Sequence, residues 1–146
     1  MDKIPENEKR SPDSVAELKV MEEREPIASF LKMRLKELAP GYAKVVMKVL
    51  PEYLNFNGFI FGGMVVAVAD QAFAYASNSI SYPSVASQFN IHFIAGAKVN
   101  DELTAECRVV KSGRRVGLSE MTVTNQEGEL IAKATGTTIP VPKSGR

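Results

Sequence analysis

The first third of the chain changes its hydrophobic spacing at short intervals, and the N-terminal part predicts helices. Apolar residues recur at helical intervals over 14–24, where Asp13 is placed to cap the first turn. Pro26 can open a second short helix that ends at Leu31. Charged residues dominate the region before it, so we expect residues 1–25 to form an N-terminal tail and a surface helix, separate from the main domain.

Strand spacing follows directly. Apolar residues alternate with basic ones over 31–36, and a second alternating run covers 42–50. The dipeptide Pro40-Gly41 between them is a turn signal, so the two runs predict a hairpin.

The segment 62–79 has a different character. It is rich in alanine and apolar nearly all round, which predicts a helix buried on most sides. The longest apolar stretch, 58–69, ends at Asp70 and is too short to span a bilayer, because a spanning helix needs about 20 apolar residues. Within the whole stretch between Glu52 and Lys98, Asp70 is the single formally charged residue.

Four strand-like runs complete the chain, separated by short polar loops that predict hairpins. They cover about 85–95, 102–111, 115–125 and 129–139. Successive antiparallel strands with one apolar helix predict an α+β fold, in which a sheet wraps around the helix. We therefore expect one domain over 26–146.

Composition excludes several function classes. The 146 residues carry 18 basic and 17 acidic side chains, so nothing in the net charge of +1 points to nucleic acid or a membrane surface. A lone cysteine, Cys107, and a lone histidine, His92, exclude a disulfide framework and rule against a metal centre. We expect Cys107 to be a packed thiol and His92 to have a structural or surface role. The chain opens on no apolar signal segment, so we expect a cytoplasmic protein.

Asp70 is the residue most at odds with its surroundings. A carboxylate in an apolar helix either finds hydrogen-bond donors or has its pKa raised. One interpretation is a structural acid that fixes packing, and the other is a perturbed carboxylate at a functional site.

The pair Gly62-Gly63 lies where this helix should begin. A helix N-terminus presents free N–H groups, and glycine lets a ligand approach them, which is the geometry of an oxyanion hole. Asp70 follows Gly62 by eight residues, or about 12 Å along a helix. One helix cannot bring both to a single reacting carbonyl. Two antiparallel copies could, so a shared site requires an oligomer.

These residues resemble the hotdog-fold thioesterases of the phenylacetic-acid-degradation type. The family pattern is Asn-x-x-Gly-x-x-His-Gly-Gly followed by an apolar helix with Leu-Ala-Asp. Here the segment 55–63 reads NFNGFIFGG, and 68–70 reads VAD. The resemblance covers about residues 27–140 and implies a hotdog fold that pairs into dimers, often as dimers of dimers.

The resemblance also implies an activity, the hydrolysis of an acyl-CoA thioester, with coenzyme A as part of the substrate and no cofactor. Gly62 would polarise the carbonyl, Asp70 of the partner subunit would act as base or nucleophile, and Asn55 would position water or the carbonyl. Ser87 is a candidate polar contact beside the site. Phe61 and Gly63 are further candidate substrate contacts. Three basic residues could bind the CoA phosphates or could simply form a solvated hairpin tip: Lys111, Arg114 and Arg115.

One position departs from the family pattern, because Phe61 stands where the family has histidine. A thioester hydrolysis needs an oxyanion donor and a base, and both remain, so we expect Phe61 to reshape the acyl pocket. The alternative is a non-catalytic acyl-CoA binding protein that uses the same pocket. A hydratase ranks last, because no histidine follows Asp70 at close spacing.

Overall fold

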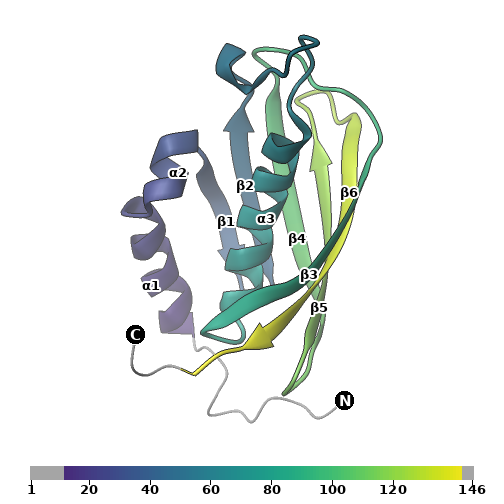
Figure 1. Ribbon diagram of the computed structural model, residues 1–146. Coiled ribbons are helices and arrows are strands. Elements are labelled where there is room, and N and C mark those ends of the chain that lie inside the picture. Colours follow the sequence, from purple (N-terminus) through teal and green to yellow (C-terminus); the bar gives the residue numbers. More distant parts are fainter. Residues whose placement is uncertain (1–11, 143–146) are drawn as a thin grey trace.

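A curved sheet surrounds one long helix in the computed structural model, which describes residues 12–142 (Figure 1). The six strands are antiparallel and lie in the order β1-β2-β4-β5-β6-β3. The α+β prediction is confirmed. The strands are β1 Arg34–Ala39, β2 Tyr42–Lys48, β3 Ser84–Phe93, β4 Glu102–Ser112, β5 Gly117–Thr124 and β6 Leu130–Pro140, and the helix is α3 Gly62–Asn78.

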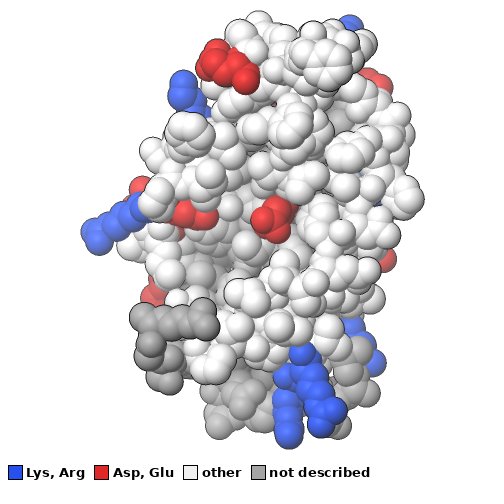
Figure 2. Space-filling model, in the orientation of Figure 1, with Lys and Arg blue, Asp and Glu red and all other residues white. Residues whose placement is uncertain are grey.

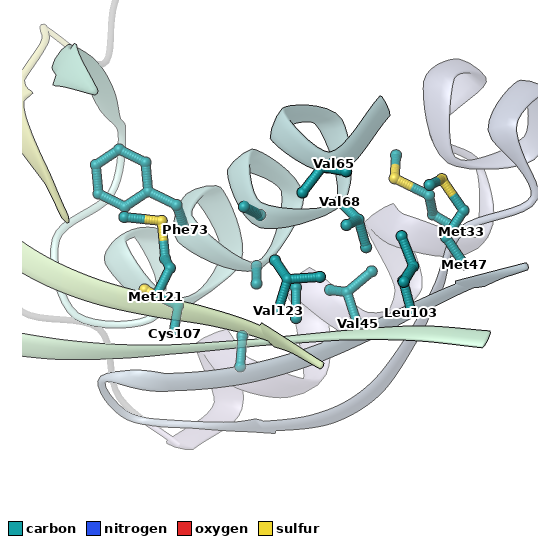
Figure 3. Close-up of a cluster of buried hydrophobic side chains, with 14 of the residues drawn as sticks. Met33, Val45, Met47, Val65, Val68, Phe73, Leu103, Cys107, Met121 and Val123 are labelled. Atoms are coloured by element: carbon teal, nitrogen blue, oxygen red, sulfur yellow. The ribbon is translucent and has the colours of Figure 1, made fainter. Parts of the chain in front are cut away.

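The core lies between α3 and the concave face of the sheet (Figure 3). Val65, Val68 and Phe73 project from the helix onto β2, β4 and β5 and are at most 2% exposed. Burying each such side chain contributes about 1.5–3 kcal/mol. The Phe73 ring reaches β6 at Gly136, where an added Cβ would lie 2.7 Å from the ring. Glycine at this position therefore lets the aromatic ring seat against the strand.

Two further helices flank β1, and here the sequence predictions need correction. α1 spans Pro12–Glu23, so it begins before Asp13, which the sequence placed ahead of its first turn. α2 spans Pro26–Leu31 as predicted, but Leu31 belongs to this helix and not to the strand. Lys32 takes a left-handed conformation (φ 54°) that ends α2, which delays the strand until Arg34. The predicted tail, 1–11, lies outside the described residues.

β3 is the edge of the sheet nearest α3, and it pairs with β6 alone. Its register shifts between Ala86 and Gln88, so Ser87 is the extra residue of a β-bulge. Most of the strand is exposed, including Val85 and Phe93. An open edge with apolar side chains is a template for pairing with another chain. Separately, none of the helices within 12–142 is long and apolar enough to cross a membrane.

Candidate active site

The N-terminus of α3 is an open set of backbone donors. Phe61 is the N-cap residue, and its carbonyl accepts from the Met64 N–H at 2.9 Å. The Phe61 N–H donates to the Tyr53 carbonyl at 2.8 Å, which ties the helix start to the preceding 3-10 turn η2 (Pro51–Tyr53). The first N–H groups of a helix have no partner within the helix. Gly62 therefore presents a donor in the positive field of the helix end.

Two aromatic rings flank these glycines. A Cβ added at Gly62 would lie 3.3 Å from the Phe93 ring, and one added at Gly63 would clash with the Phe61 ring. Both rings are themselves exposed, at 57% each. Because glycine has no side chain, the rings lie against the helix without covering it. Next to Gly62, the Phe93 ring borders an apolar hollow of about 340 Å³, which Phe59 and Ile94 also line.

Asn55 organises the loop that leads to this helix end. Its Oδ1 accepts hydrogen bonds from the backbone N–H groups of Asn57 at 2.9 Å and Phe59 at 3.2 Å. Its own N–H donates to the Phe59 carbonyl at 2.7 Å. The side-chain oxygen is thus occupied by the loop. Within residues 12–142 the amide nitrogen Nδ2 has no hydrogen-bond partner and is the group left for a ligand.

Asp70 lies on a side of α3 that no other element of the described residues, 12–142, covers. The sequence predicted a buried carboxylate. On the single chain Asp70 is instead exposed, although its neighbours on α3 are apolar and mostly buried. Within 12–142 no hydrogen bond or ion pair reaches the carboxylate. The surrounding protein still raises the pKa of Asp70. Apolar atoms exclude water from part of the carboxyl group, and this desolvation disfavours its charged form. The face of the molecule over α3 is largely uncharged (Figure 2).

Ser87 and the predicted phosphate contacts lie on the sheet. Ser87 Oγ is 2.8 Å from Thr137 Oγ1, across the β3–β6 pair, so a hydrogen bond to Thr137 fixes the Ser87 hydroxyl. The hairpin between β4 and β5 carries three exposed basic side chains, and basic groups gather at the lower end of the molecule (Figure 2). This hairpin contacts the C-terminal end of α3, since one small cavity is lined by both Ser77 and Gly113. The basic side chains are Lys111, Arg114 and Arg115.

The single chain therefore assembles only part of the predicted site. Asn55, Phe61, Gly62 and Gly63 lie together at the N-terminus of α3. Asp70 is about 12 Å further along the helix axis, and the basic hairpin lies at the opposite helix end.

One polar cluster had no signal in the sequence. Glu25, just before α2, accepts through Oε2 from Gln71 Nε2 at 2.8 Å and from the Tyr75 hydroxyl at 2.5 Å. Burial and this hydrogen bond raise the pKa of Tyr75 well above its ordinary value. The partners are 46 and 50 residues apart, so no spacing rule links them. The cluster joins the N-terminal helices to α3 directly beside Asp70.

The residues expected to be structural behave so. Cys107 is buried in β4, and burial raises the pKa of its thiol to about 12, which makes it a poor nucleophile. His92 is exposed on β3. Within 12–142 no group of three His, Cys, Asp or Glu side chains is placed to hold a metal ion.

Comparison with known proteins decides the family. The profile of the Thioesterase superfamily matches residues 57–132, which is more than half of the chain and contains both Gly62 and Asp70. The chain belongs to the thioesterase superfamily. The acyl-coenzyme A thioesterase PaaI of Escherichia coli is 33% identical over 77% of this chain and 80% of its own length.

Solved structures agree with this membership. The structure of E. coli PaaI, from the phenylacetic acid degradation operon, superimposes with a TM-score of 0.84 at 30% identity, over 90% of this chain and 97% of that one. A Streptococcus mutans protein bound to acetyl CoA has a TM-score of 0.73 at 30% identity, over 77% and 91% of the two chains. The predicted hotdog fold and the PaaI-type resemblance are confirmed, and this thioesterase is an enzyme.

Proposed function

We propose that this thioesterase hydrolyses acyl-CoA in a site formed between two antiparallel copies of the chain. The observation that carries this proposal is the separation on α3. A backbone donor at Gly62 and an unpaired carboxylate at Asp70 lie on one helix, about 12 Å apart, on a side that no other element covers. A second copy running the opposite way brings Gly62 of one chain to Asp70 of the other.

The open β3 edge supports the same assembly. β3 has a free side, and its exposed Phe93 and Val85 lie near the uncovered helix face. Pairing two such edges would cover apolar surface and continue the sheet. An acyl-CoA substrate is supported by the relatives, of which one is named an acyl-CoA thioesterase and another binds acetyl CoA.

The chemistry needs three groups and no cofactor. The Gly62 N–H and the Asn55 amide hold the thioester carbonyl and stabilise the negative charge that develops on its oxygen. Asp70 of the partner subunit takes a proton from water as the water oxygen bonds to the carbonyl carbon. The C–S bond then breaks, the CoA sulfur takes up the proton from Asp70, and the acyl group leaves as a carboxylic acid.

We assign Asp70 the role of base because of its environment. Desolvation raises the pKa of its carboxyl, and a base is most effective when its pKa lies nearer the working pH. The rate should therefore fall as the pH is lowered through this raised pKa.

The basic hairpin fits the CoA phosphates. It lies at the C-terminal end of α3, which in the proposed antiparallel pair is about 12 Å along the axis beyond the partner's Gly62. Arg and Lys side chains suit phosphate well. A dimer is the smallest assembly that completes the site, and a dimer of dimers in the cytoplasm stays a prediction from the sequence.

Release of free thiol from a panel of aryl and aliphatic acyl-CoAs tests the function. We expect turnover by the wild type and a loss of about 10²–10⁴-fold in kcat for Asp70→Asn, which is the usual contribution of a general base. Asn matches Asp in size, so the fold should be retained, which circular dichroism checks. Near-normal turnover by Asp70→Asn would contradict the proposal. No turnover by either protein, with CoA esters raising the melting temperature, would favour the non-catalytic binding protein.

A further inference from the structure

A second hollow lies between α1 and the C-terminal half of α3, apart from the one at Gly62. Its volume is about 460 Å³, enough for a medium-sized group. Leu18 and Met21 of α1 form one wall, and Ala74 and Tyr75 of α3 form the other. The wall from α1 lies outside the 57–132 match to the superfamily, so it is contributed by the part of this chain that precedes the matched domain.

This hollow is apolar except for a few fixed groups. Glu25 lines it with a carboxylate whose Oε2 is held by Gln71 and Tyr75. Within 12–142 its other oxygen, Oε1, has no hydrogen-bond partner, and no cation pairs with the charge. Ser84 also lines the hollow, and its buried Oγ has no partner in the same part of the chain. Glu25 therefore offers a free acceptor in a mostly apolar chamber.

The hollow lies next to the proposed position of the reacting carbonyl, on the C-terminal side of Asp70. Ala74 lies one helical turn after Asp70 on the same exposed side of α3, and Ala74 lines the hollow. Tyr75, which holds Glu25, is five residues beyond Asp70, or about 7.5 Å along the axis. An extended acyl chain advances about 1.25 Å per carbon, so a chain of about six carbons spans the rise along α3 from Asp70 to Tyr75.

We propose that this hollow binds the acyl end of the substrate, and that Glu25 selects a medium-length acyl group with a hydroxyl at its far end. The inference rests on the proposed function and names the substrate class of the same site. A hydroxyl can donate to Oε1 without an added charge, whereas an acyl group ending in a carboxylate is repelled by Glu25. The CoA phosphates are excluded for the same reason and remain with the basic hairpin.

The test compares hexanoyl-CoA with 6-hydroxyhexanoyl-CoA on the full-length protein. For the wild type we expect kcat/KM to be about tenfold higher for the hydroxylated substrate, as for one hydrogen bond to a charged group. Glu25→Gln should reduce that ratio several-fold, mainly through KM. The matched control is Glu23→Gln, which removes the same charge from an exposed residue of α1 that does not line the hollow. It should keep the wild-type ratio.

The outcomes separate the two proposals. Equal kcat/KM for both substrates, unchanged by Glu25→Gln, would overturn the acyl-selection proposal while leaving the thioesterase intact. Turnover of neither substrate, nor of the wider panel, would instead overturn the proposed function.

A second variant covers the case in which Glu25→Gln loosens the N-terminal helices. Ala74→Met fills the mouth of the hollow from a position that is exposed on the single chain and lies outside its core, and size-exclusion chromatography checks that the pair of chains still forms. It should shift the kcat/KM ratio of hexanoyl-CoA to butanoyl-CoA at least about fivefold toward the shorter chain, as for one or two methylenes lost from a pocket. An unchanged chain-length preference would place the acyl group elsewhere and contradict the proposal.

Discussion

The two sides of α3 differ in burial: the side toward the sheet is buried, and the outer side is exposed on the single chain. The side toward the sheet carries Val68 and Phe73, which are at most 1% exposed and pack against three strands. The outer side carries Asp70 and Ala74, and nothing within residues 12–142 covers them. The inner side explains why the helix is stable, whereas the outer side is explained only by what binds there. The predictions below set changes on one side against changes on the other.

Phe73→Ala should give the largest effect on stability. Removing a fully buried ring that contacts β6 and Phe89 leaves a cavity, and such changes cost about 3–5 kcal/mol. Urea unfolding monitored by circular dichroism measures the loss. Ala74→Ser, on the outer side one residue away, should stay within about 0.5 kcal/mol of wild type. Similar costs for the two variants would mean that the two sides do not differ as described.

Gly62→Pro should give the matching effect on chemistry. Proline fits the first residue of a helix, where it removes the N–H and adds its ring. Phe61 already has the backbone conformation (φ −63°, ψ 125°) that a following proline requires. We expect kcat to fall about 10²–10³-fold, the usual contribution of an oxyanion donor, with little change in unfolding free energy.

The control for this variant is Gly62→Ala. Alanine adds the same Cβ, 3.3 Å from the Phe93 ring, but retains the N–H. Its rate should stay far above that of Gly62→Pro. Equal losses in both variants would trace the defect to crowding by Phe93 and not to the missing donor.

Mixing two inactive variants should restore activity if the site is shared. In a mixed dimer of Asp70→Asn and Gly62→Pro, one site has both groups intact and the other has neither. Random exchange makes half of the dimers mixed, so about a quarter of the wild-type rate should return. The measurement is thiol release after co-refolding at equal concentrations. Activity no higher than that of the separate variants would mean that each site lies within one chain.

The smallest effect is on the pH dependence of stability. Because the pKa of Asp70 is raised in the folded protein, its ionised form opposes folding, and this penalty appears as the pH rises above the ordinary range of an aspartate. Asp70→Asn should therefore melt higher than wild type by up to a few degrees at pH 7. The difference should shrink as the pH is lowered toward that range. A lower melting temperature for Asp70→Asn at pH 7 would assign Asp70 a stabilising role.

The elements that the sequence predicted well are those whose residues carry a local pattern. The apolar run places α3 within one residue of its observed end, and the alternating runs place the last four strands to within two residues at each end. Lys32 shows the limit of such patterns, because its left-handed turn separates α2 from a strand that the alternation began at Leu31.

The site divides in the same way. Gly62-Gly63 lie at the helix start, as the apolar run over 62–79 predicted, so a local pattern was enough to place them. The exposure of Asp70 did not follow from a local pattern, because a helix that is apolar all round gives no sign of which side will remain open. Glu25 and Tyr75 meet only through the tertiary fold, across 50 residues, so no periodicity brings them together.

The spacing of Gly62 and Asp70 along one helix makes the activity depend on the concentration of the protein itself. In the proposed shared site, a lone chain holds both groups but cannot apply them to one bond, so a newly made copy would be inert until it meets another. Activity per chain should then rise with concentration and vanish on dilution below the dissociation constant of the pair. The hydrolase would thus be dormant while it is scarce, without any inhibitor.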